Sequence, residues 1–240
     1  EMILAVGAVE LFYEKQGKGR PLILLHGNGE DHHIFDESVD ALAKEWTVYR
    51  PDSRGHGQSS PVREFHYQDM AEDIISMIEE LQLVRPCLYG FSDGGITGLL
   101  IAAQRPDLLS GLIISGANLN PKGLKRFPLW MYRAAWFFSR SPKLRLMLTE
   151  PNLSQEDLAR ISVPVWVTAG QRDVIRKEHT KRIAEAIPVS GLRIAQGESH
   201  SSYVLRGSTF LPIIQEGLCF VRQRETLRWQ KSAHGDPEEK

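Results

Sequence analysis

The chain of 240 residues has no excess of either charge, because 29 lysines and arginines are balanced by 30 aspartates and glutamates, for a formal net charge of −1. Proteins that bind nucleic acid through a basic surface need a clear positive excess, so nucleic acid is not indicated as a partner. No apolar run reaches about 18 residues, the length needed to cross a bilayer. We therefore expect neither a nucleic-acid partner nor stable insertion into a membrane.

Cysteine is scarce as well, with only Cys87 and Cys219. Two cysteines do not make a disulfide framework, and a cytoplasmic location is expected. The sequence lacks glycine-rich loops of the G-x-G-x-x-G or P-loop type, which argues against a nucleotide cofactor. The run Glu30-Asp31-His32-His33 offers metal ligands, but no further histidine pair precedes it, and Asp31 is better suited to begin a helix. We expect no metal and no cofactor.

The sequence does contain a series of eight short apolar runs, most of which end at a polar or glycine-rich loop. Continuous runs of leucine and β-branched residues are typical of strands that are buried on both faces. The first two runs flank Gly7 and predict a hairpin. The runs span residues 3–6, 8–13, 22–26, 47–50, 86–90, 112–115, 164–169 and 192–195.

Helical periodicity fills the gaps between these runs. Apolar stripes at helical spacing occur over residues 35–43, 67–81 and 96–103. Strands that alternate with helices predict a mostly parallel, doubly wound α/β sheet. Ligands of such sheets bind at the loops that leave the carboxyl ends of the strands, so the functional residues are expected there.

Residues 119–161 interrupt this alternation, because they contain no good strand. Between Lys122 and Arg145 the sequence has seven lysines and arginines and no acid, interleaved with aromatic residues. We interpret residues 119–161 as a short helical lid whose apolar face lines the substrate pocket, with Trp130 and Phe137 as candidate substrate-binding residues. The alternatives are an amphipathic surface for anionic lipid or a partner, and a segment that only covers the sheet.

This interpretation divides the chain into an α/β core of residues 1–118 and 162–230 and a lid insertion of residues 119–161. The last ten residues, 231–240, are mostly polar and are expected to form a disordered tail. No internal repeat or low-complexity segment suggests a further domain.

A candidate nucleophile occurs in Gly90-Phe91-Ser92-Asp93-Gly94, which follows the fifth apolar run and precedes a helical stripe. A serine at the tip of so sharp a turn crowds the residues two positions away, and glycine at both positions removes the clashing Cβ atoms. The hydroxyl then lies at the start of a helix, where free N–H groups favour developing negative charge. The pattern G-x-S-x-G between a strand and a helix therefore predicts Ser92 as a nucleophile.

A serine hydroxyl is a weak nucleophile and needs a base that is itself oriented. Asp173 follows the seventh apolar run and His200 follows the eighth, so both are expected at the same sheet edge as Ser92. The chain order serine, aspartate, histidine fits this architecture. We expect His200 to take and return the serine proton and Asp173 to hold the imidazole, with Glu178 and Glu198 as weaker candidates for the acid.

An oxyanion hole is expected in part from His26-Gly27-Asn28-Gly29, at the end of the third apolar run. Its glycines allow the backbone to approach a ligand closely. The backbone N–H groups of Asn28 and Asp93 are the expected donors, one from this loop and one from the residue after the nucleophile. The His26 side chain is expected only to support the loop by hydrogen bonding.

These blocks, together with Asp52-Ser53-Arg54-Gly55-His56-Gly57-Gln58-Ser59, resemble the α/β-hydrolase superfamily over nearly the whole chain. The D-x-R-G-x-G-x-S pattern is a hallmark of that family and has a structural role. Residues 86–120 are similar to the valacyclovirase (biphenyl-hydrolase-like) branch, in which the aspartate that matches Asp93 binds the α-amino group of an aminoacyl ester. The lid and the segment after Asp173 differ from that branch. The serine at position 92 argues against a haloalkane dehalogenase, which would need aspartate there.

The resemblance and the residues together predict the α/β-hydrolase fold and hydrolysis of a small carboxylic ester through an acyl-serine intermediate. An aminoacyl ester is one candidate substrate, which the Asp93 side chain would bind; the simpler role for Asp93 is to stabilise the N-terminus of its own helix. The alternatives are hydrolysis of a carbon–carbon bond in a diketone-like substrate by the same three residues, and a non-catalytic ligand receptor on the same scaffold. The sequence does not indicate an oligomeric state.

Overall fold

The computed structural model describes the backbone of residues 1–233 and the side chains of residues 1–227. All eight predicted strands form, and they lie in one sheet in the order β1-β2-β4-β3-β5-β6-β7-β8. The strands are β1 (Met2–Val6), β2 (Val9–Gln16), β3 (Arg20–Leu25), β4 (Trp46–Pro51), β5 (Cys87–Phe91), β6 (Gly111–Ser115), β7 (Val165–Arg172) and β8 (Ser190–Ser199).

The sheet is antiparallel only at one edge. β1 pairs with β2 and β2 pairs with β4 in antiparallel register, whereas the neighbouring pairs from β4 to β8 are all parallel. This confirms the predicted α/β class with a mostly parallel sheet. Because parallel strands end at the same edge, the loops after β3, β5, β6, β7 and β8 converge there.

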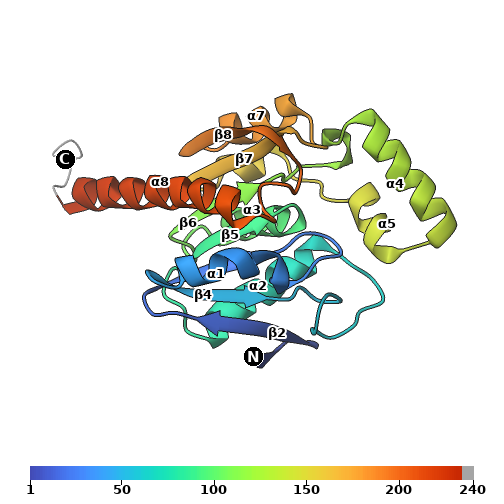
Figure 1. Cartoon of the computed structure of the whole chain (residues 1–240). Coiled ribbons are helices and arrows are strands. Elements are labelled where there is room, and N and C mark those ends of the chain that lie inside the picture. Colours follow the sequence, from blue (N-terminus) through green and yellow to red (C-terminus); the bar gives the residue numbers. More distant parts are fainter. Residues whose placement is uncertain (234–240) are drawn as a thin grey trace.

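Helices cover both faces of the sheet (Figure 1). Those that share a core with one face are α2 (Tyr67–Glu80), α3 (Asp93–Gln104) and α7 (Lys177–Ala186), and those on the other face are α1 (Asp36–Leu42) and α8 (Gly207–Ala233). The three helical stripes expected from the sequence correspond to α2, to α3, and to α1 with the preceding turn η1 (His32–Phe35).

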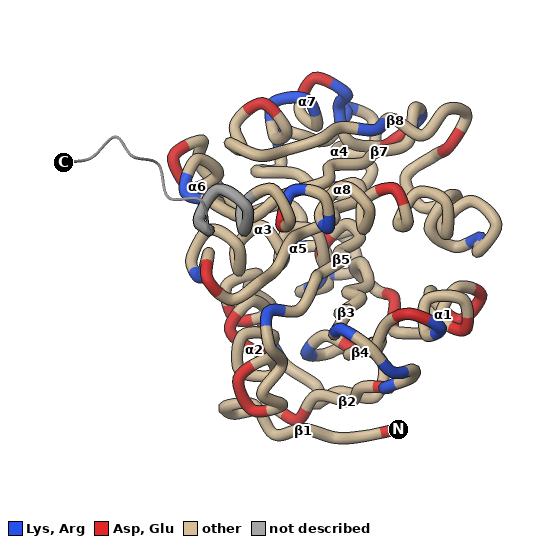
Figure 2. The backbone as a smooth tube through the Cα atoms, turned by 90° about the vertical axis from the view of Figure 1, so that its left-hand side faces the viewer, with Lys and Arg blue, Asp and Glu red and all other residues tan. Residues whose placement is uncertain are grey.

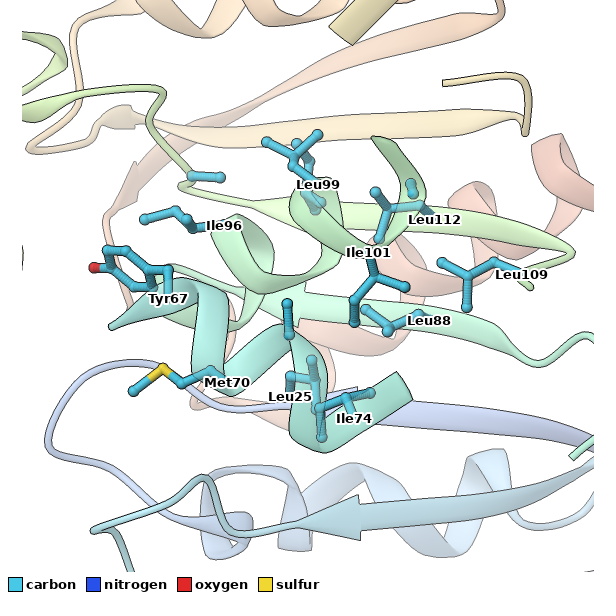
Figure 3. Close-up of a cluster of buried hydrophobic side chains, with 14 of the residues drawn as sticks. Leu25, Tyr67, Met70, Ile74, Leu88, Ile96, Leu99, Ile101, Leu109 and Leu112 are labelled. Atoms are coloured by element: carbon cyan, nitrogen blue, oxygen red, sulfur yellow. The ribbon is translucent and has the colours of Figure 1, made fainter. Parts of the chain in front are cut away.

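Neighbouring residues of one strand belong to opposite cores. Leu25 and Leu88 pack in the core that contains α2 and α3, whereas Leu24 and Tyr89 pack in the core that contains α1 and α8. Side chains alternate between the two faces of a strand, so a strand covered on both faces needs apolar residues at every position. Figure 3 shows Leu25 and Leu88 among the side chains of the first of these cores, together with Ile74 of α2. This packing explains the continuous apolar runs.

Residues 119–161 form η2 (Pro121–Gly123), α4 (Arg126–Ser139), α5 (Pro142–Thr149) and α6 (Gln155–Ala159). α4 and α5 extend away from the sheet (Figure 1). By contrast, Leu153, Leu158 and Ile161 are buried in the core that contains α2 and α3. The part that stands away from the body is therefore the α4–α5 pair, and the segment around α6 packs against the core.

The predicted disordered tail of residues 231–240 is described only in part. Residues 231–233 form the last residues of α8, and residues 234–240 lie outside the described part, so disorder of the tail stays a prediction. None of the described helices is both long enough and apolar enough to span a membrane. Acidic and basic residues are spread over most of the chain (Figure 2), in keeping with the balanced net charge.

Candidate active site

Ser92 connects β5 to α3 in a sharp turn. Its backbone has φ +51° and ψ −112°, in the region that residues other than glycine rarely adopt. A Cβ atom at Gly90 would overlap the carbonyl of Gly94, and a Cβ atom at Gly94 would overlap the carbonyl oxygen of Leu25. Glycine at both flanking positions thus allows the turn, for the steric reason that the G-x-S-x-G spacing suggested.

The structure brings together the three residues that the sequence placed after separate strands. The Nε2 atom of His200 lies 3.1 Å from the Oγ atom of Ser92, and its Nδ1 atom lies 2.7 Å from the Oδ1 atom of Asp173. The Asp173 carboxylate also accepts hydrogen bonds from the backbone N–H groups of Gly170 and Ile175, at 3.1 and 3.0 Å. These distances permit proton transfer from serine to an imidazole that is itself held in place.

The charges in this arrangement shift the pKa values of both titratable groups. Burial raises the pKa of the Asp173 carboxyl, but the hydrogen bond and charge of His200 and the two backbone donors outweigh it, so the pKa is lowered. Burial lowers the pKa of His200, but the hydrogen bond and charge of Asp173, with the charges of Glu30 and Asp93, outweigh it, so the pKa is raised above 6.5. The pair therefore favours an ionised aspartate beside a more basic imidazole.

The weaker candidates for the acid lie in other surroundings. The Glu198 carboxylate accepts hydrogen bonds from the Ser202 hydroxyl and the Arg206 guanidinium. Glu178 is exposed in the first turn of α7. Neither carboxylate is bonded to His200 within the part of the chain that the structure describes, so the geometry favours Asp173.

Gly116, at the end of β6, is a residue of the site that the sequence reasoning missed. Its φ is +64°, and a Cβ atom there would lie 2.7 Å from Cε1 and 2.9 Å from Nδ1 of His200. The imidazole thus lies directly against the Gly116 backbone, and only glycine leaves room for it. A glycine immediately after a buried strand, at the sheet edge that holds the other site residues, was the available signal.

The backbone N–H groups of Asn28 and Asp93 belong to residues close to Ser92, because Asn28 lines the same outer pocket and Asp93 follows Ser92 in the chain. Asp93 is the first residue of α3, where the N–H has no partner inside the helix. Among the described residues, no hydrogen-bond acceptor is present for either of these two N–H groups. Both are therefore available to an oxyanion that forms at Ser92.

Two side chains hold the loop that carries Asn28. His26 is buried, and its Nδ1 bonds the carbonyl of Gly27 while its Nε2 accepts the backbone N–H of Ser53. Glu30 accepts the backbone N–H of Gly27 at 2.9 Å and closes the turn. Burial raises the pKa of the Glu30 carboxyl. Glu30 was considered from the sequence only as a metal ligand; its place just after the glycine loop was the signal for this role.

Asp93 directs its side chain into the protein rather than toward solvent, and it is only 5% exposed. One carboxylate oxygen accepts the Tyr67 hydroxyl at 2.7 Å, and the other accepts the Asn28 side-chain amide at 2.8 Å. Burial raises the pKa of this carboxyl, and the two hydrogen bonds offset only part of that rise. Both hydrogen-bond partners of this carboxylate are neutral, and the charges of His200 and Lys143 act on it without a hydrogen bond.

Two cavities meet at Ser92 and His200. The outer pocket, of about 290 Å³, also has Tyr132, Leu144 and Met147 of α4 and α5 in its wall. The inner cavity, of about 20 Å³, is lined by Asp93, Tyr67 and Glu150 among others. A larger groove of about 490 Å³ lies between residues 63–66 and α5, contains neither Ser92 nor His200, and shares only Glu150 with the inner cavity.

Trp130 and Phe137 differ from expectation, because they line neither of the two cavities at Ser92. Their side chains are 64% and 60% exposed on the outward side of α4. Tyr132 occupies the inward position in their place. Trp130 and Tyr132 are two residues apart, a rotation of about 200° around a helix, so they point in opposite directions.

The Asp31, His32 and His33 group has its ligand atoms within 4.8 Å of one another. Asp31 is the N-cap of η1 and accepts the backbone N–H of His33, as the sequence suggested for a helix start. The ring of His32 bonds Asp52 and the ring of His33 bonds Asp36, each at 2.8 Å. These contacts use the Nδ1 atom of each ring.

Comparison with known proteins gives the family of the chain. The model of the α/β hydrolase fold family matches residues 20–184. Human serine hydrolase BPHL is 26% identical over 249 residues, covering 90% of this chain and 85% of that protein. Pyrrolizixenacetamide deacetylase of Xenorhabdus hominickii is 32% identical over 130 residues, and this match covers 52% of the chain and about half, 49%, of that protein.

The fold also matches solved structures. A structure from a study of carboxylesterases of the thaumarchaeon Nitrososphaera gargenis superposes with a TM-score of 0.80 at 20% identity, covering 93% of this chain and 100% of that one. The family model spans more than half of the chain, and the sheet agrees with it. The chain therefore belongs to the α/β hydrolase fold family, as a hydrolase similar to the BPHL branch.

Proposed function

We propose that the protein hydrolyses small carboxylic esters through an acyl-serine intermediate. The Ser92 hydroxyl attacks the ester carbonyl carbon while His200 Nε2 takes the hydroxyl proton. The carbonyl oxygen becomes an oxyanion that accepts hydrogen bonds from the backbone N–H groups of Asn28 and Asp93. His200 then gives the proton to the leaving alcohol. A water molecule, deprotonated by His200 in turn, releases the acid and restores Ser92.

The observation that supports this most directly is the unbroken chain of contacts from Ser92 to His200 to Asp173. A hydroxyl at 3.1 Å from an imidazole nitrogen, with a buried carboxylate behind the ring, is the arrangement that activates serine. The outer pocket of about 290 Å³ opens at the same hydroxyl and suits a small substrate. The names of the relatives, a serine hydrolase and a deacetylase, agree with acyl transfer.

The test is Ser92→Ala, with Ser208→Ala as the control because Ser208 is an exposed serine that lines neither cavity at Ser92. Ser92→Ala should lower kcat on p-nitrophenyl acetate at least ~10³-fold and abolish labelling by a fluorophosphonate, with unchanged thermal unfolding. Ser208→Ala should retain both activities. Near-normal turnover by folded Ser92→Ala would overturn the mechanism.

A narrower substrate class, the α-aminoacyl esters, is favoured by the inner cavity. The two carboxylates of Asp93 and Glu150 both line it beside Ser92. An ester whose acyl group carries an α-ammonium would place that cation a few ångströms from the attacked carbonyl carbon, within reach of Asp93. A buried carboxylate with a raised pKa gains most from such a partner, because the cation offsets the cost of burying its charge.

This substrate class is tested with an α-aminoacyl ester and its des-amino analogue, in the wild type and in Asp93→Asn. Loss of the ion pair should lower kcat/KM for the amino ester by ~1.5–3 kcal/mol and leave the analogue nearly unchanged. Glu150→Gln in the same assay identifies which carboxylate recognises the amine. An equal effect on both substrates would return the function to a general carboxylesterase.

The two other expected activities are outcomes of the same assays. Turnover of a vinylogous diketone that exceeds turnover of p-nitrophenyl acetate would indicate a carbon–carbon bond hydrolase that uses the same residues. A protein that neither turns over any of these substrates nor reacts with the fluorophosphonate would be a ligand receptor on this scaffold. A cytoplasmic location stays a prediction that rests on the two unpaired cysteines.

A further inference from the structure

The outward face of α4 is an unusually apolar surface. It consists of Phe127, Trp130, Met131, Phe137 and Phe138, whose side chains are between 50% and 83% exposed. No residue of α4 is buried. A surface helix normally turns its apolar stripe toward the core and its polar face toward solvent, and here large apolar side chains point outward. Such a patch marks an interaction site.

The helical spacing makes this surface continuous. Phe127, Trp130, Met131 and Phe138 follow one another at intervals of three, one and seven residues, which places them along one stripe of the helix. The opposite side of α4 carries Tyr132, which lines the outer pocket. One helix thus forms part of the wall of the candidate active site and, on its other side, an exposed aromatic stripe.

The charge around the stripe identifies its partner. Residues 122–145 contain seven lysines and arginines and no acid. Arg126 and Arg133 lie seven residues apart, on the same side of α4, and both are exposed. Neither forms an ion pair with any described residue. Glu64, an acid from outside the segment, has a carboxylate oxygen 4.0 Å from a guanidinium nitrogen of Arg145 on α5. This ion pair does not involve the cations of α4.

We propose that the outward face of α4 docks on an anionic lipid surface. Aromatic and methionine side chains enter the boundary between headgroups and acyl chains, while the flanking arginines contact lipid phosphates. A second copy of this chain fits less well, because a two-fold contact through α4 would bring two all-basic segments together. α4 also extends from the body of the molecule, so the sheet does not obstruct a flat surface (Figure 1).

The consequence for the site is one of position. Tyr132, Leu144 and Met147 connect the docked helices to the wall of the outer pocket. A bilayer on the outward face of α4 would be separated from the outer pocket by that one helix, so docking would hold Ser92 close to the membrane surface. Docking itself requires neither Ser92 nor His200, which separates this proposal from the proposed chemistry.

The test is flotation of the full chain with vesicles of phosphatidylcholine alone or with about one-third phosphatidylglycerol. We expect binding to the anionic vesicles that weakens with salt, and little binding to the neutral ones. Phe127→Ser/Trp130→Ser/Phe138→Ser and, separately, Arg126→Glu/Arg133→Glu should each lower the bound fraction at least about tenfold. All of these side chains are exposed, so thermal unfolding should not change.

Two controls complete the experiment. Val84→Ser removes an equally exposed apolar side chain, 83% exposed as Phe138 is, but outside α4, and should bind as the wild type does. Ser92→Ala should also bind normally. The proposal is overturned if the wild type does not float with anionic vesicles, if the triple serine variant floats equally well, or if that variant instead abolishes a dimer seen by sedimentation.

Discussion

His200 carries the first prediction at the scale of single residues. Burial alone would lower its pKa, but the negative charges of Asp173, Glu30 and Asp93 raise it above 6.5. The base must be neutral to accept the serine proton, so kcat/KM should be low in acid and rise with pH through an ionisation above 6.5. The surrounding carboxylates are the reason that this pKa is higher than that of a free imidazole.

Glu30→Gln tests that explanation. Removing one of the negative charges should move the midpoint of the kcat/KM profile to lower pH, and the loss of a charged partner for the Gly27 N–H should also lower kcat. Glu64→Gln, an exposed carboxylate outside the site, is the control and should leave the midpoint in place. A Glu30→Gln profile that coincides with the wild-type profile would contradict the assigned role of Glu30.

Tyr132 and Trp130 form a second test at this scale, because they lie on opposite sides of α4. Tyr132→Ala should raise KM or lower kcat/KM several-fold for a soluble ester, since it removes part of the outer-pocket wall. Trp130→Ala should leave the kinetics of a soluble ester nearly unchanged, since its side chain is 64% exposed. The reverse ranking would show that α4 is rotated relative to the site.

At the scale of elements, the residue after β6 determines where the residue after β8 can lie. Gly116 has no side chain, and the imidazole of His200 occupies the space that a side chain would fill. Gly116→Ala should push the imidazole of His200 out of place, because the new Cβ atom would lie 2.7 Å from its Cε1 atom. A displacement of about 1 Å in a catalytic group costs roughly 10²-fold in rate, and we expect a loss of that order in kcat/KM. Circular dichroism should show an intact fold.

Gly7→Ala is the matched control for Gly116→Ala. Gly7 has a comparable φ of +55°, but a Cβ atom there would have no neighbour within 4 Å. Both variants carry a similar backbone strain of about 1–2 kcal/mol, so their loss of stability due to φ should be alike. Only Gly116→Ala should lose activity. Equal activities of the two variants would mean that crowding at His200 does not matter.

At the scale of the whole molecule, stability should depend on pH through the loops beneath the site. Burial, together with the charge of the neighbouring His26, lowers the pKa of His56 to about 4. The unfolded chain binds a proton at this position below about pH 6.5, whereas the folded chain does not. The contribution of His56 to the free energy of unfolding is therefore complete above pH 6.5 and is lost as the pH falls from 6.5 to 4.

The measurement is the free energy of unfolding by urea at several pH values in the wild type and in His56→Phe, which keeps an aromatic ring beside His26 and Phe65. The decrease between pH 6.5 and pH 4 should be smaller in His56→Phe, by at most about 3 kcal/mol. Other groups titrate equally in both proteins and cancel in the difference. Parallel curves would place the acid sensitivity elsewhere in the molecule.

Local patterns in the sequence were sufficient for the sheet and for the residues around Ser92. The eight apolar runs predict the eight strands because a strand covered on both faces needs apolar side chains at every position. The glycines around Ser92 predict the sharp turn for a steric reason that concerns only a few neighbouring residues. Asp173 and His200 could be placed at the same edge because parallel strands end there.

Only the tertiary structure decided in which direction the side chains of α4 point and which distant residues contact the site. The rotation of α4 places Tyr132 at the site and Trp130 in solvent, and composition alone does not fix the rotation of a helix that packs against α5. Gly116 matters because His200 approaches it from a strand more than 80 residues later in the chain. The buried setting of Asp93 likewise depends on Tyr67, a distant residue. Contacts between segments far apart in sequence leave no local pattern, and the structure is needed to find them.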